Sequence, residues 1–371
     1  MSTNERRAVN GKLVSVPVAL TMAAFALLPA GAAVASSSPG ATTTPAPGAG
    51  SPTPTPGAPV TPQPAPPAER VKLKMSGVGG KPLFAGVGAK LVIYGRITPY
   101  QVGQRATIAF YLRRRQIGSE LLRVAPRTDG SGSFQVRLAI HAAGPLTAVA
   151  AVHVAPGVVA SAHTPVVQYV HTGITPGTSG GSVRVLQSEL NRMHYAVPLS
   201  GVFDEATERA LIAFRKVTGM GREGLAGTEL FRKLAHGEGA FPVRYRHDGR
   251  HVEANLTKQV LAEIEPGGKV RDIYTMSSGK PSTPTVVGRF SVYMKTLGVN
   301  AKGMVDSNYF IRGYAIHGYA EVPTYAASHG CLRVPIPNAP AIYSWVRLGT
   351  PVDVYDQGGG GSTHPRGNAG P

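Results

Sequence analysis

The sequence of 371 residues contains a single cysteine, Cys331, and this scarcity excludes an internal disulfide. The stability of its folded parts must therefore come from packing. No cysteine lies near the N-terminus, which excludes lipid attachment through a lipobox cysteine. A lone thiol is either buried and inert or kept for its chemistry. Cys331 is therefore the first candidate for a reactive group.

Acidic residues are also scarce, with Asp+Glu 20 against Lys+Arg 38, so the formal net charge is +18. Such a balance suggests a polyanionic partner: nucleic acid, an acidic membrane surface or anionic wall polymers. The sequence has no nucleic-acid-binding motif and no basic run beyond residues 113–115, so we expect no nucleic acid partner. A GC-rich genome, which enriches Arg and Ala, is an alternative origin of the charge.

No hydrophobic run is long enough to span a bilayer comfortably. The apolar stretch Leu13 to Leu28 contains Pro17 and falls short of the roughly 20 residues that a membrane helix needs. Basic residues precede it, and small residues that a signal peptidase accepts follow at 33–35. We expect a signal peptide over 1–35 and export to the periplasm or cell wall. An uncleaved N-terminal anchor is the alternative.

Charge is absent from Ser36 to Ala68, where proline recurs. Such a segment cannot bury a core, so residues 36–69 are expected to form a Pro/Thr-rich disordered linker. The Gly-rich tail, residues 357–371, is expected to be disordered as well.

Residues 70–170 contain short runs that alternate apolar and polar side chains, such as Ile108, Phe110 and Leu112. About seven strands separated by turn signals predict a β-sandwich. The segment resembles bacterial immunoglobulin-like (Ig-like) modules through its patterning alone. A binding role and an inert spacer are both open for it.

Residues 178–237 carry helical periodicity instead, with an apolar stripe in the first helix and Asp204 as the N-cap of the second. This small all-α segment resembles the three-helix peptidoglycan-binding domain found beside many wall enzymes. The matching residues are Val185-Leu186-Gln187, Leu190, Gly201-Val202-Phe203-Asp204, Thr207, Ala210 and Phe214. The family usually has Gln after the Phe, where this chain has Arg215. A structural bundle that only positions its neighbour is the alternative.

Residues 245–356 return to strand patterns, with one helix expected over 339–346, and include Ala315-Ile316-His317-Gly318 and Ser328-His329-Gly330-Cys331-Leu332-Arg333. A thiol becomes a useful nucleophile as a thiolate, which needs a neighbouring base. Glycine before the cysteine allows a tight turn whose N–H groups converge on one oxygen, an oxyanion hole worth on the order of 3 kcal/mol per donor. A zinc site with His317, His329 and Cys331 as ligands is the alternative.

The same motifs resemble the L,D-transpeptidase catalytic domain, whose signature is a His, a gap, Ser/Thr-His-Gly-Cys, an apolar residue and Asn or Arg. Upstream, Ser278-Gly279-Lys280 and the segment 283–290 look like the family's approach to its active-site sheet. The resemblance covers about the last third of the chain and implies a mainly-β catalytic domain there. The whole chain then reads as a multidomain protein of sandwich, three-helix bundle and catalytic domain.

The resemblance also implies roles for individual residues. Cys331 is the nucleophile and His317 the general base, with the carbonyl of Gly318 orienting the imidazole. The N–H groups of His329, Gly330 and Cys331 form the oxyanion hole. Ser328 belongs to the substrate-binding residues, together with Arg333, whose guanidinium suits a carboxylate. Ten residues separate His317 from Ser328, at the short side of the family's range.

The reaction implied is the transfer of a peptidoglycan tetrapeptide donor to the amine of a diamino-acid acceptor, giving a 3→3 crosslink. No metal or organic cofactor is needed, and a monomer is expected. Water as acceptor makes a carboxypeptidase, and a protein lysine makes a wall-protein anchoring enzyme. A catalytically silent wall-binding scaffold is the remaining alternative.

Overall fold

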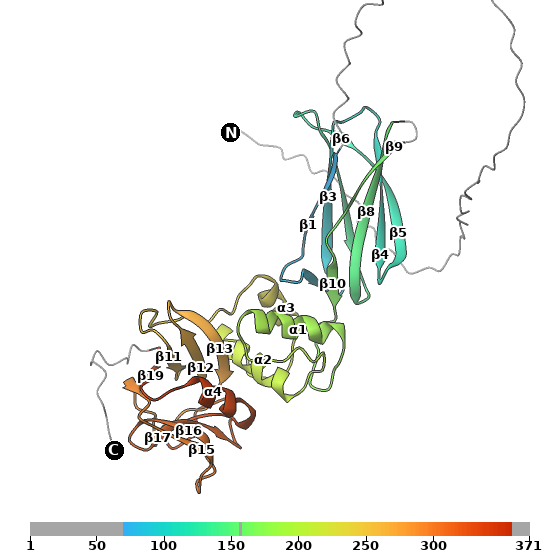
Figure 1. Ribbon diagram of the computed structural model, residues 1–371. Helices are drawn as coiled ribbons and strands as arrows, with labels where there is room; N and C mark the ends of the chain where they lie inside the picture. Colours follow the sequence, from blue (N-terminus) through green and yellow to red (C-terminus); the bar gives the residue numbers. More distant parts are fainter. Residues whose placement is uncertain (1–69, 156–157, 358–371) are drawn as a thin grey trace, which may run out of the picture.

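The computed structural model describes residues 70–155 and 158–357. The expected signal peptide (1–35), linker (36–69) and tail beyond 357 lie outside the described residues. Figure 1 shows three bodies in sequence: a β-sandwich, a cluster of helices and a mainly-β C-terminal segment. Within the described ranges, no helix is long and apolar enough to cross a membrane.

The sandwich consists of two sheets that enclose one hydrophobic core. The first sheet has the order β1 (Arg70–Ser76), β3 (Lys90–Thr98), β7 (Gly132–Ala139), β6 (Ala125–Pro126). The second has the order β2 (Phe84–Gly86), β10 (Val167–Val170), β8 (Gly144–Ala155), β4 (Arg105–Leu112), β5 (Arg115–Arg123), with β9 (Val158–His163) also on β8. The expected two-layer arrangement is present, with more strands than the seven expected. Its immunoglobulin-like character stays a prediction.

Three helices follow, namely α1 (Gly181–Arg192), α2 (Glu205–Thr218) and α3 (Thr228–Ala235). The N-cap prediction is confirmed, because the backbone N–H of Thr207 donates to Asp204 Oδ1 at 2.8 Å. Gly219 ends α2 in the left-handed region, which glycine tolerates best. Arg215 is buried and donates to the carbonyl oxygens of Gly221 and Leu225, so it fixes the loop after α2.

The C-terminal segment contains two sheets around a second core. One has the order β13 (Lys269–Thr275), β12 (Val260–Glu265), β11 (His251–Asn255), β19 (Pro351–Tyr355), β14 (Gly288–Ser291). The other has the order β15 (Met294–Val299), β16 (Val305–Ile311), β17 (Tyr314–Tyr319), β18 (Leu332–Pro335). The 3-10 turn η1 (Ile336–Asn338) and α4 (Ala339–Trp345) follow β18.

The helical and C-terminal segments share a hydrophobic core. Strand β12 is buried on both faces because its alternate side chains enter different cores. Leu261 packs in the core of the C-terminal segment, whereas Val260 and Ala262 pack among the helices. Figure 1 shows α2 beside β12 and β13. The two segments therefore form one packed unit.

Candidate active site

Strands β17 and β18 position the candidate catalytic residues. They are parallel and in a register that pairs Ile316 with Leu332 and His317 with Arg333. Ile316 and Leu332 are fully buried in the core. Because side chains alternate along a strand, His317 and Arg333 lie on the opposite face. Cys331 precedes β18 by one residue and therefore shares that face with Arg333.

The imidazole of His317 is held in one tautomer. Its Nδ1 lies 2.8 Å from the backbone oxygen of Gly318, and the side chain is only 3% exposed. A carbonyl oxygen can only accept, so Nδ1 must carry the proton. Burial lowers the pKa of His317, and the positive charge of Arg333 adds to the effect. The neutral ring therefore presents an unprotonated Nε2 as a base.

The thiol of Cys331 is partly accessible and forms no disulfide. Its Sγ lies 3.9 Å from the backbone oxygen of Gly313, at the turn between β16 and β17. Burial raises the pKa of the thiol, while a hydrogen bond with the Ala315 backbone and the charge of Arg333 act in the opposite direction. At neutral pH the resting group is therefore a thiol, and a base is needed to remove its proton.

The turn before Cys331 is organised by Ser328, and this corrects two expectations from the sequence. Ser328 is fully buried, and its Oγ donates to the Cys331 carbonyl at 2.6 Å. The same Oγ accepts from the N–H of Gly330 at 3.0 Å. Ser328 is therefore closed off from substrate and holds the turn instead. The N–H of Gly330 is already engaged, so it is not a free donor for an oxyanion hole.

Gly330 itself is required by the backbone. Its φ is +120°, and an added Cβ would lie 2.5 Å from the Tyr314 ring. Its carbonyl accepts from Thr285 Oγ1 at 2.8 Å, and Thr285 accepts from the N–H of Gly279 at 2.9 Å. Thr285 thus joins the catalytic turn to the segment 278–280. Sequence reasoning quoted Thr285 only as part of a motif and missed this positioning role.

His329 is exposed, and its Nε2 lies 3.3 Å from Lys280 Nζ. An ammonium has protons to donate and no lone pair, so Nε2 of His329 accepts this hydrogen bond. The bond occupies the lone pair that a general base would use. Of the two histidines, His317 is the one with a free basic nitrogen.

Arg333 lies on the same face of the sheet and packs against an aromatic ring. Its guanidinium carbon stands 4.0 Å from the centre of the Tyr319 ring. Tyr319 also lines a cavity of about 560 Å³ between the C-terminal segment and α2. Tyr319 therefore contacts both His317 and Arg333 and also lines a groove that the helical segment helps to form.

The loop between His317 and Ser328 is tied down from both segments. Ser277 Oγ donates to the Tyr325 carbonyl at 2.7 Å. Arg222, from the helical segment, donates to the Thr324 carbonyl. The short spacing of this loop is thus accommodated by contacts with its neighbours. Sequence reasoning missed Arg222, because nothing in the linear pattern pairs it with a residue about a hundred positions away.

No group of three His, Cys, Asp or Glu side chains that could hold a metal ion occurs within residues 70–155 and 158–357. His317, His329 and Cys331 are therefore not gathered as three ligands. The structure instead places a partly accessible thiol, a buried histidine and a guanidinium on one face of the sheet.

Comparisons with known proteins carry the assignment further. Residues 249–354 match the family model of the L,D-transpeptidase catalytic domain, and residues 179–234 match that of a peptidoglycan binding domain. The crystal structure of an L,D-transpeptidase from Xylanimonas cellulosilytica is 33% identical, covering 50% of this chain and 98% of that one, with a TM-score of 0.47. This chain belongs to the L,D-transpeptidase family.

Two further solved structures show lower sequence identity. An L,D-transpeptidase from Stackebrandtia nassauensis is 21% identical, covering 50% of this chain and 95% of that one, with a TM-score of 0.32. An L,D-transpeptidase mutant from Enterococcus faecium is 27% identical, covering 29% and 50%, with a TM-score of 0.26. A search of curated proteins finds no match. The two matched domains give peptidoglycan as the substrate and the cell wall as the site of action.

Proposed function

We propose that this protein forms 3→3 peptidoglycan crosslinks through a thioester on Cys331. The observation that carries the proposal is the hydrogen bond between His317 Nδ1 and the Gly318 carbonyl, because it leaves Nε2 free to take the thiol proton. The position of Cys331 on the same face of β17 and β18 supports the pairing.

The proposed reaction has two halves. Sγ of Cys331 attacks the carbonyl between the diamino acid at stem position three and the terminal D-Ala, while His317 Nε2 takes the thiol proton. The proton passes to the departing amine of D-Ala, and a thioester remains. The amine of a second stem then attacks the thioester, His317 removes the amine's surplus proton, and the thiol is restored.

The tight turn before Cys331 supplies N–H donors that would stabilise the negative charge that develops on the carbonyl oxygen. Because Gly330 N–H is bonded to Ser328, the N–H groups of His329 and Cys331 are the donors we propose for the oxyanion. Arg333 is the residue we propose for a substrate carboxylate. Its planar guanidinium can bind a carboxylate bidentately while remaining stacked near Tyr319.

Incubation with purified disaccharide tetrapeptide tests the proposal. A crosslinked dimer, identified by mass, is the expected product, and Cys331→Ala should form none. Tripeptide alone would make the protein a carboxypeptidase, and transfer to a wall protein's lysine would make it an anchoring enzyme. No product at all, from wild-type protein that stays folded, would support a silent scaffold.

A further inference from the structure

The first strand of the sandwich carries a row of cations on one face. Arg70, Lys72 and Lys74 are exposed, whereas the residues between them are half-buried toward the core. Residues two apart on a strand point to the same side and lie about 6.8 Å from one another. The strand therefore presents a regular line of positive charge that the core does not require.

The neighbouring strands add to this charge. In the register of β1 and β3, Lys72 lies directly opposite Arg96. Like charges facing each other across a sheet are destabilising. Six cationic side chains in all line a trough of about 1090 Å³ over this sheet, namely Arg70, Lys72, Lys74, Arg96, Arg123 and Arg127.

Neutralising partners are few. Asp129 pairs with Arg96 at 2.7 Å and with Arg127 at 3.7 Å, and among the described residues no carboxylate lines the trough itself. None of the ion pairs found between described residues involves Arg70, Lys72, Lys74 or Arg123. Four of the six cations are therefore left to an external anion or to solvent.

We propose that this trough binds a linear anionic polymer of the cell wall, a flexible chain whose repeats carry phosphodiester charges. A regular row of cations in a concavity complements a chain of regularly spaced anions. The uncharged segment 36–68 of this protein offers no such complement. The exposed aliphatic residues Leu121 and Val158, which a membrane surface would favour, lie on strands of the other sheet. Tyr94, which is exposed and lines the trough, has a phenolic hydroxyl that can donate to a phosphate oxygen. The inference is independent of the proposed reaction.

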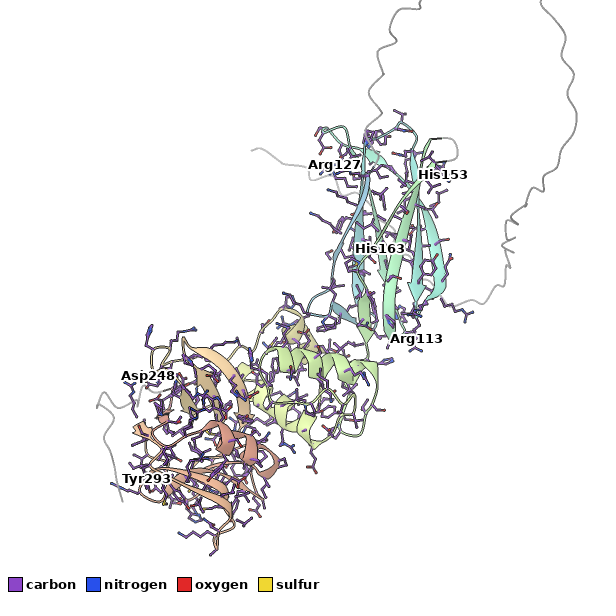
Figure 2. The ribbon with its side chains drawn as sticks, viewed as in Figure 1. Arg113, Arg127, His153, His163, Asp248 and Tyr293 are labelled. Carbon is purple, nitrogen blue, oxygen red and sulfur yellow. The ribbon has the colours of Figure 1, made fainter. Side chains whose placement is uncertain are left out.

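The test uses immobilised polyglycerol phosphate and the full-length protein with Arg70, Lys72 and Lys74 all changed to Gln. A matched control changes Arg113, Arg114 and Arg115 to Gln, since these are exposed at the hairpin between β4 and β5, line no part of the trough and remove the same charge. Figure 2 shows the trough residue Arg127 at the end of the sandwich away from the helices. Arg113, one of the control residues, lies at the end near the helices.

The trough variant should bind roughly 10- to 100-fold more weakly at low salt. The slope of log affinity against log salt should fall by about 2, since each contact contributes roughly 0.7 for a single-stranded polyanion. The control should bind like wild type. If the triple variant unfolds, Lys72→Gln with Lys74→Gln gives the same comparison with a slope change of about 1.4.

Equal losses of affinity in the trough variant and the control, or no loss in either, would overturn the proposal that the trough is the binding site. A trough-specific loss on phosphatidylglycerol vesicles without one on polyglycerol phosphate would overturn the choice of occupant. Activity on small soluble tetrapeptides should stay at the wild-type level in both variants.

Discussion

The Nδ1 atom of His317 lies 2.8 Å from the backbone oxygen of Gly318, the next residue on the same strand. This contact needs no particular side chain at position 318, because the backbone supplies the acceptor. It fixes the proton on Nδ1 and leaves Nε2 as the basic nitrogen. Burial lowers the pKa of His317 and raises that of Cys331, so the resting pair is neutral at pH 7.

A neutral pair predicts the pH dependence of acylation. Because the pKa of His317 is depressed below its usual 6.5, the base stays unprotonated as pH falls to that value and is lost only at more acidic pH. The rate of acylation by a carbapenem should thus be flat from pH 8 to 6.5 and then fall. Arg333→Gln removes a charge that lowers this pKa, so its midpoint should move to higher pH. A wild-type rate that climbs steadily between pH 7 and 9 would contradict the neutral pair.

Replacement of the two histidines should separate their roles. His317→Ala should lower acylation by roughly 10²–10⁴-fold, as expected for the loss of a general base. His329→Ala should cost much less, because its Nε2 is already bonded to Lys280. Intact-mass spectrometry of the carbapenem adduct over time measures both rates. A greater loss in a folded His329→Ala protein would reverse the assignment.

Ser328 should affect catalysis only by holding Cys331 in position. Ser328→Ala removes the donor to the Cys331 carbonyl and the acceptor of the Gly330 N–H, so the nucleophile is no longer held. We expect kcat to fall about 10²-fold, the scale of a small misplacement, with KM little changed. Ser328→Thr keeps the hydroxyl and should retain most activity. A rise in KM with unchanged kcat would instead indicate that Ser328 contacts the substrate directly, against the positioning role.

The sequence was sufficient to predict local features of the fold. It was not sufficient to predict the contacts between segments. Asp204 was identified as a cap because capping depends on neighbours in the chain, and its bond to Thr207 confirms it. The pattern of residues 289–294 by itself predicts one strand, but the stretch divides between β14 and β15, which belong to different sheets. Alternation alone does not show where a chain passes from one sheet to another.

The same limit applies to the site. Cys331 and His317 could be predicted as site residues because they belong to a motif that is compact in sequence. The engagement of Gly330 by Ser328 depends on a turn geometry that residue types do not reveal. Arg222 acts on the active-site loop from another segment altogether.

Gly330 offers a test of the backbone geometry. With φ at +120° and the Tyr314 ring 2.5 Å from an added Cβ, Gly330→Ala should strain the turn and lower the free energy of unfolding by about 1–3 kcal/mol. Gly181→Ala is the control, since its Cβ would meet open space and it is the first residue of α1, outside the left-handed region. Thermal unfolding measures the difference. Equal unfolding temperatures for the two variants would show that the turn tolerates a side chain.

The last prediction concerns Lys216 in α2, a residue that ties the helical segment to the sheet beneath the site. Its Nζ is buried and donates to the Gln259 carbonyl at 3.0 Å, Thr275 Oγ1 at 2.7 Å and the Met276 carbonyl at 3.0 Å. Met276 precedes Ser277, whose backbone forms two hydrogen bonds of 2.9 Å with that of Arg333. The lysine therefore supports the strand that carries the proposed substrate cation.

Lys216→Met keeps the length of the side chain but removes the donor to Thr275 Oγ1 and to the Met276 carbonyl, while the Gln259 carbonyl still accepts from the N–H of Met276. Each buried acceptor left unpaired costs about 1–3 kcal/mol, so the unfolding temperature should fall clearly, and carbapenem acylation should slow several-fold. Lys269→Met makes the same chemical change at an exposed position on β13 and should leave both measurements near wild type. If Lys216→Met unfolds and acylates like the Lys269 variant, the helical segment does not support the site through this residue. A loss of stability with full acylation at low temperature would confine the role of Lys216 to folding.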